Sequence, residues 1–234
     1  ATQMVEAGWT GVRGTLTGDV SYLSAFAEEA RPEALTAGLG ERFEIMEAAI
    51  KKWCVGSPIQ AALDSLTAIM AEHGVGEDDV ARLTATMPDD RLHIVDDRDM
   101  PDVCLQHLLA VTLLDGGLSF AAAHDKARMD DAAVRALRAR IVAEPSAELT
   151  AAHPPRQAII TIDTRDARTL RHHTRAVLAT PANPMSAGQL AAKARDLLVP
   201  HLGAPGADRL IAAVLDLERM ADVRSLSRLL RVGG

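Results

Sequence analysis

The sequence predicts an α+β fold in which a domain of mixed strands and helices is inserted between two segments of a helical domain. Helical patterns occupy both ends of the chain, whereas the middle contains apolar alternations typical of strands. The stretch Thr180-Pro181-Ala182-Asn183-Pro184 is a stiff connector, because two prolines in five residues exclude helix and sheet interior. We therefore expect residues 1–40 and 179–234 to form parts of the helical domain and residues 41–178 to form the α+β domain.

The first forty residues predict short helices separated by loops. A helix around Met4 stops at Gly8, and a second runs from Val20 to Ala30 before Pro32. Because the chain begins at Ala1 inside a helical pattern, we expect part of the protein to lie upstream.

The predicted α+β domain opens with a strand and a helix. Phe43 and Ile45 alternate with polar residues and predict a strand at 43–50. A helix follows at about 58–73, and a second strand is expected at 80–87.

The second half of this domain predicts a buried helix and a hairpin. Residues 101–114 are apolar on nearly every helical side, so this helix should be buried. A helix at 131–140 and a strand at 142–149 follow. The clearest alternation of the sequence predicts a strand at 158–163, and residues 165–175 are its expected hairpin partner.

Everything after the connector is predicted to be helical. Helices are expected at 186–198, 205–220 and 222–230, because Pro200 and Gly203 interrupt the pattern.

Composition limits the classes of function. The 234 residues carry 25 Lys and Arg against 32 Asp and Glu, and the net charge of −7 with scattered basic residues argues against a nucleic-acid partner. No apolar run is long enough for a membrane span, and no signal peptide is evident. Two cysteines, spaced unlike metal ligands, fit a reducing compartment. We therefore expect a cytoplasmic protein without a metal site.

The stretch from Lys51 to Gln60 has the features of an anion site. Lys51 and Lys52 precede Ser57, which can cap a helix whose first residue is Pro58, and Gln60 completes a Ser-x-x-Gln capping box. Cations beside a helix N-terminus favour a carboxylate or phosphate. The alternative is that both lysines are solvated and that Gln60 only caps the helix.

Three stretches resemble, in the same order, the MmgE/PrpD family, which includes 2-methylcitrate dehydratase, cis-aconitate decarboxylase and iminodisuccinate epimerase. They are Ile50 to Asp64, Met100 to His107 with its continuation to Gly116, and Asn183-Pro184-Met185-Ser186 before Lys193. The resemblance implies that 41–178 is an α+β lid on a large helical domain. Family members are about twice as long as this chain, so the resemblance also implies that most of the helical domain lies upstream. Separately, the resemblance implies a homodimer.

The resemblance also implies chemistry without a metal or organic cofactor. Family members remove a proton next to a carboxylate, or release a carboxylate, and the aspartate and histidines on the helical side of their cleft belong to the upstream half. We therefore expect a lyase acting on a small di- or tricarboxylate. The alternatives are an epimerase of the same family and a truncated, non-catalytic subunit that depends on a partner.

Site residues follow from the same comparison. Lys51 falls on the family's active-site lysine in the lid. His107 aligns with a position where better-known members have a substrate-facing tyrosine, and Gln60 with a position often held by histidine. We take Lys51 and His107 as candidate catalytic residues and Lys52, Gln60 and Ser57 as candidate substrate-binding residues. The competing interpretations are a core histidine at 107, a solvated Lys52 and a capping Gln60.

Overall fold

The structure is a computed structural model that describes residues 2–11, 13–16 and 18–231. Helix makes up 53% of the residues, and the strands form one four-stranded mixed sheet. This confirms the predicted α+β class. The contacts between residues divide the chain into two compact units, 1–47 and 48–234. The predicted domain limits at 40 and 178 remain a prediction.

The helical pieces in the described part of the first unit are short and exposed. They are α1 (Thr2–Glu6), α2 (Tyr22–Phe26), η1 (Pro32–Leu35) and η2 (Glu44–Glu47). The helix predicted at 20–30 is thus shorter, and it begins at Ser21, whose hydroxyl accepts a hydrogen bond from the amide of Ser24.

The predicted strand at 43–50 is wrong. Residues 44–47 form a 3₁₀ turn, and the side chain of Ile45 is 76% exposed. Two alternating apolar residues do not fix a strand unless a neighbouring strand pairs with them, and the four strands of the sheet pair only with one another.

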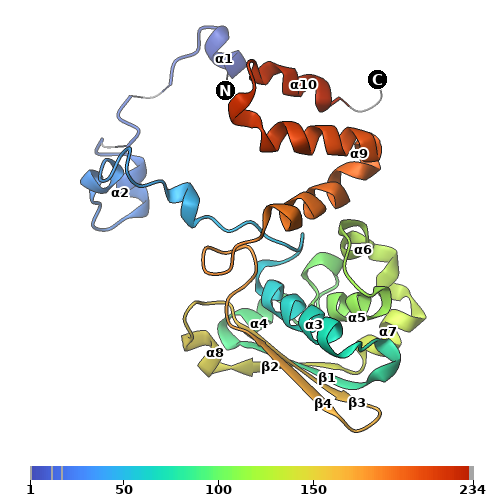
Figure 1. The fold of residues 1–234 in the computed structure, drawn as a ribbon. Coiled ribbons are helices and arrows are strands. Elements are labelled where there is room, and N and C mark those ends of the chain that lie inside the picture. Colours follow the sequence, from blue (N-terminus) through green and yellow to red (C-terminus); the bar gives the residue numbers. More distant parts are fainter. Residues whose placement is uncertain (1, 12, 17, 232–234) are drawn as a thin grey trace. The chain divides into compact units, whose positions relative to one another are not determined.

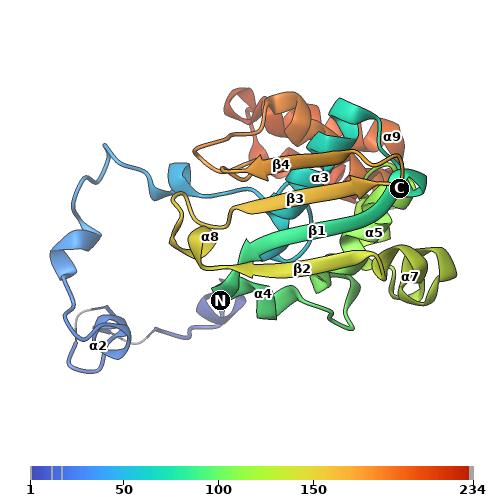
Figure 2. The ribbon, with the colours of Figure 1, turned by 90° about the horizontal axis from the view of Figure 1, so that it is seen from below.

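The second unit is built on a sheet with the order β2-β1-β3-β4. Figure 2 shows the four strands side by side. β1 pairs with β2 in parallel and with β3 antiparallel, and β3 and β4 form an antiparallel hairpin as predicted. The strands are β1 (Val80–Pro88), β2 (Ile141–Ser146), β3 (Ala158–Thr164) and β4 (Thr169–Thr174).

Two helices, α3 (Gln60–His73) and α5 (Leu105–Asp115), cover one face of this sheet (Figure 1). α5 confirms the predicted buried helix, although it starts later because Pro101–Val103 form a 3₁₀ turn, η5. Gly116, with φ +70°, ends it in the left-handed conformation that glycine adopts without strain. The largest side chains of the core come from both layers: Leu63, Leu66, Ile69, Leu83, Leu105, Leu108, Leu109, Ile160 and Ile162.

Short helices complete the crossover from β1 to β2 and the link to β3. They are α4 (Asp89–Val95), α6 (Phe120–His124), α7 (Ala132–Arg138) and α8 (Ala147–Ala151), with the 3₁₀ turn η6 (Lys126–Asp130). Another 3₁₀ turn, η4 (Glu77–Asp79), lies between α3 and β1. α7 confirms the helix predicted at 131–140. The strand predicted at 142–149 ends early, because the hydroxyl of Ser146 accepts a hydrogen bond from the amide of Leu149 and caps α8.

The C-terminal part is the long helix α9 (Ala187–Leu215), followed by η7 (Leu217–Arg219), η8 (Val223–Ser225) and α10 (Leu226–Leu229). Ser186 and Gln189 form the capping box that starts α9. The predicted break is confirmed at Gly203, where φ is 66° and ψ is 165°. Two shorter helices therefore meet there.

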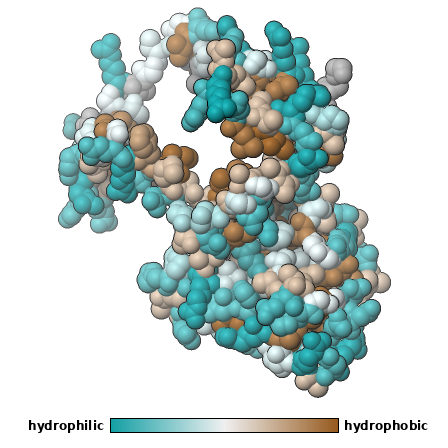
Figure 3. All heavy atoms as spheres, viewed as in Figure 1, coloured by the Kyte–Doolittle hydropathy of each residue, from teal (hydrophilic) through white to brown (hydrophobic). Residues whose placement is uncertain are grey.

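An apolar groove lies between the two halves of α9 and α10. Figure 3 shows hydrophobic surface in this region. Val214 is 50% exposed and Leu230 60% exposed. The lining is entirely apolar: Leu190, Ala191, Ala194, Leu198, Leu210, Ile211, Val214, Leu215, Leu226 and Leu230.

Within the described ranges, none of the helices has both the length and the apolar character that crossing a bilayer requires.

Candidate functional site

The loop of residues 51–55, before α3, is fixed by the side chain of Gln60 at the start of α3. Its Nε2 donates to the carbonyl of Trp53 at 2.9 Å and to that of Val55 at 3.4 Å, while its Oε1 accepts from the Trp53 amide at 3.2 Å. Gln60 is only 4% exposed, so these bonds replace water as partners of the loop backbone.

The predicted capping box between Ser57 and Gln60 is therefore wrong. Ser57 lies in the 3₁₀ turn η3 (Ser57–Ile59), and no side chain caps α3 at its first turn. The α-helix begins at Gln60 itself, two residues later than expected, and the amide side chain turns back to the preceding loop.

A half-buried carboxylate, that of Asp64, ties the same loop to the chain after β4. The indole Nε1 of Trp53 donates to Oδ1 of Asp64 at 2.9 Å, and the amide of Leu178 donates to Oδ2 at 2.9 Å. Both oxygens of Asp64 are thus engaged, which orients the Trp53 ring against α3.

Lys193 on α9 joins the C-terminal helix to this loop. Its Nζ donates to the carbonyl of Lys51 at 2.5 Å and to that of Lys52 at 3.4 Å, and lies 3.3 Å from Sγ of Cys54. The chain has four lysines, and three of them meet at this loop.

Lys51 and Lys52 point their ammonium groups to different surroundings. Lys51 is exposed, and its Nζ donates to the carbonyl of Val55 at 2.9 Å. Lys52 is half-buried, with its Nζ 4.1 Å from the centroid of the Trp53 ring, a cation–π contact. Burial lowers the pKa of Lys52, and the nearby charge of Asp64 opposes that shift.

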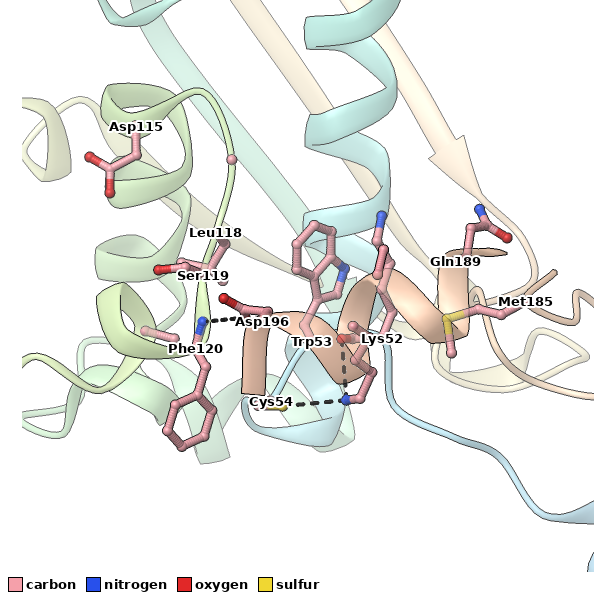
Figure 4. A pocket seen from close by; sticks show the side chains of 14 residues that line it. Lys52, Trp53, Cys54, Asp115, Leu118, Ser119, Phe120, Met185, Gln189 and Asp196 are labelled. Atoms are coloured by element: carbon pink, nitrogen blue, oxygen red, sulfur yellow. Dashed lines mark hydrogen bonds between the residues drawn. The ribbon is translucent and has the colours of Figure 1, made fainter. Parts of the chain in front are cut away.

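A cavity of about 630 Å³ opens beside this loop (Figure 4). One wall comes from the loop, another from the segment between α5 and α6, and a third from α9. The amide of Phe120 donates to Oδ2 of Asp196 at 2.8 Å and so links the second wall to the third. The polar and aromatic side chains of the lining are Lys52, Trp53, Cys54, Asp115, Ser119, Phe120, Gln189, Lys193 and Asp196.

The carboxylates of this cavity already have partners. Asp115 forms a two-pronged ion pair with the guanidinium of Arg128, and Asp196 accepts the Phe120 amide. Lys52 and Lys193 form no ion pair with any carboxylate that the structure describes. The cavity therefore offers the two ammonium groups of Lys52 and Lys193 to an anionic ligand.

His107 lies elsewhere, on α5 in the hydrophobic core. It has no exposed surface, and neither ring nitrogen has a hydrogen-bond partner within the described chain. Burial lowers its pKa to about 4, with the charges of Arg138 and Arg128 adding to the effect and Asp125 opposing it. The imidazole is neutral at pH 7 and is not part of the cavity lining.

The structure thus brings together Lys51, Lys52 and Gln60 around one loop, places Ser57 at the turn that follows, and separates His107 from them. The roles predicted for these five residues remain predictions. Two site residues escaped the sequence analysis, Lys193 as a ligand of the loop backbone and Asp64 as the anchor of Trp53. Lys193 is 142 residues from Lys51 and Asp64 is 11 residues from Trp53, and both contacts are set by tertiary folding rather than by a local sequence pattern.

Metal ligation finds no support in the geometry. Among residues 2–11, 13–16 and 18–231, no three His, Cys, Asp or Glu side chains come together as ligands of one ion.

Comparison with known proteins gives one clear relationship. No individual curated protein matches the chain significantly. Residues 53–219, well over half of the chain, match the MmgE/PrpD C-terminal domain. The matched span contains the cavity lining except Lys52, together with the whole sheet. The chain therefore belongs to the MmgE/PrpD family.

Proposed function

We propose that the protein is a cofactor-independent lyase, a dehydratase or decarboxylase, whose substrate is a small di- or tricarboxylate. In this proposal the chain supplies the lid side of the active site, and the group that removes the proton belongs to a helical part upstream. A homodimer in the cytoplasm is part of the same proposal.

One observation carries the proposal: three of the four lysines gather on the loop beside the cavity. The carboxylates in the lining are engaged by Arg128 and by the Phe120 amide. A substrate carboxylate in the cavity would meet the ammonium groups of Lys52 and Lys193, with Lys51 on the same loop, in a site where charge–charge attraction is stronger than in bulk water.

The chemistry needs this positive charge at one step. Removing a proton next to a carboxylate builds negative charge on an enolate-like intermediate, which cations and hydrogen-bond donors stabilise. We assign that stabilisation to Lys51, with Lys52 binding a carboxylate. Gln60 and Lys193 act as positioning residues, because they hold the backbone that carries both lysines. Ser57 stays a candidate donor to the substrate, and neutral His107 a candidate acid or base.

Proton exchange tests the proposal before the substrate is known. The full-length native protein is incubated in D₂O with a panel of di- and tricarboxylates and a metal chelator, and the ¹H NMR signals next to each carboxylate are followed. We expect one substrate to exchange its proton and to lose water or carbon dioxide.

The panel also separates the alternatives. Exchange accompanied only by inversion at carbon would indicate an epimerase, which shares the first step. Failure of every carboxylate to exchange would contradict catalysis and favour a non-catalytic subunit.

A further inference from the structure

A second polar cavity, of about 570 Å³, lies between α3, the end of β4 and the chain that follows it. Lys52 is the one residue that lines both cavities. The second cavity is formed at the open edge of the sheet, because β4 is the outermost strand.

Four basic side chains line this cavity: Lys52, His172, His173 and Arg175. Side chains alternate along a strand, so His172 shares a face of β4 with Thr174. That face is turned to α3, since the hydroxyl of Ser65 donates to Oγ1 of Thr174 at 2.8 Å. His172 is thereby directed to the same side of the sheet as α3.

In this cavity two permanent cations, Lys52 and Arg175, face one carboxylate, that of Asp64. Arg175 is exposed and, like Lys52, forms no ion pair with the carboxylates that the structure describes. Asp64 supplies the only carboxylate of the lining. Its two oxygens accept hydrogen bonds from the indole of Trp53 and the amide of Leu178, and its charge raises the pKa of Lys52 against the effect of burial.

His173, the second histidine of the lining, lies in the same positive electrostatic potential. Burial lowers the pKa of His173, and the positive charges of Arg175 and Arg171 lower it further. Its Nε2 lies 2.8 Å from Oε1 of Gln157, so the side chain of Gln157, just before β3, holds this ring in place.

We propose that the second cavity is a binding site for a small oxyanion, a carboxylate or a phosphate group, held by Arg175, Lys52 and His172. The guanidinium offers a two-pronged contact to either group, and the ammonium and imidazole supply further donors. The site adjoins the proposed active site, because Lys52 lines both cavities, but binding of the oxyanion does not require turnover.

Ligand titration of the intact protein tests this site. Inorganic phosphate and succinate are the two probes, each followed by isothermal titration calorimetry at constant ionic strength. We expect Arg175→Gln to weaken binding about fivefold or more, since it removes a charged two-pronged contact. The control is Arg171→Gln, which removes the same charge at an exposed residue outside the cavity lining and should leave the affinity within about twofold of the parent, because solvent and salt screen an exposed charge.

The two probes and a third variant assign the result. Tighter binding of succinate identifies a carboxylate site, and tighter binding of phosphate a phosphate site. The proposal is overturned if neither probe binds or if Arg171→Gln and Arg175→Gln weaken binding equally. It is also overturned if Lys193→Met abolishes binding while Arg175→Gln does not, because the anion would then occupy the first cavity.

Discussion

His107 illustrates how one buried side chain links stability to pH. Its imidazole is fully buried, has no hydrogen-bond partner in the described chain and has its pKa lowered to about 4. The pKa of histidine in an unfolded chain is about 6.5. Between these values the unfolded state binds a proton that the native state does not, so the free energy of unfolding falls as pH drops from 6.5 towards 4.

Replacing His107 by leucine should remove this dependence. The shift corresponds to about 3 kcal/mol lost by pH 4, and relieving the unpaired ring nitrogens should add about 1–3 kcal/mol at pH 7. Urea unfolding of His107→Leu at pH 7 and pH 4.5 measures both effects.

The matched control is His93→Leu, at an exposed histidine on α4, which should keep the parent's pH dependence. A His107→Leu protein whose stability falls with pH as steeply as the parent's would contradict this account of the buried imidazole.

At the scale of elements, the conformation of the loop of residues 51–55 depends on α3. Gln60→Met keeps the size of the side chain but removes its bonds to the Trp53 amide and carbonyl. We expect a loss of about 1–3 kcal/mol in the free energy of unfolding, because buried backbone groups lose their partners. Hydrogen exchange of the 48–58 peptide should also become faster.

Urea unfolding and hydrogen-exchange mass spectrometry measure the two changes, with Gln3→Met at an exposed position as the control. Unchanged protection of the loop would show that Gln60 does not hold it.

Elements with strong local patterns were predictable from the sequence. The hairpin of β3 and β4 has clear alternation, α5 is apolar on every side, and Gly203 interrupts α9 where the sequence predicts a break. The expected strand at 43–50 fails because its pattern covers too few residues and no strand pairs with it.

The site was predictable only in part. Lys51, Lys52 and Gln60 were found because they are close in sequence, whereas Lys193 is 142 residues from the carbonyl it binds. The side chain of Gln60 could serve a helix cap or the loop equally well by sequence. Burial of the Trp53 backbone decides between them, and burial is a property of the folded chain.

At the scale of the whole molecule, residues 53–219 match the MmgE/PrpD C-terminal domain, and a cavity lined by Lys52 and Lys193 lies between the sheet-bearing part and α9. The proposed active site depends on both parts, because Lys193 of α9 fixes the loop that carries Lys51. Activity should therefore be more sensitive than stability to changes in this loop.

The catalytic role of the loop of residues 51–55 is tested by comparing the turnover of Lys51→Ala with that of Lys126→Ala in the full-length protein. The substrate is the carboxylate that exchanges its proton in D₂O. Lys126 is the fourth lysine and is exposed on η6, away from the cavity lining. We expect Lys51→Ala to reduce kcat by about 100-fold or more while the free energy of unfolding changes by less than about 1 kcal/mol, because Gln60 still donates to the Val55 carbonyl. Lys126→Ala should resemble the parent in both. Turnover of Lys51→Ala within a few-fold of the parent would remove Lys51 from the mechanism and contradict the proposed role of the loop.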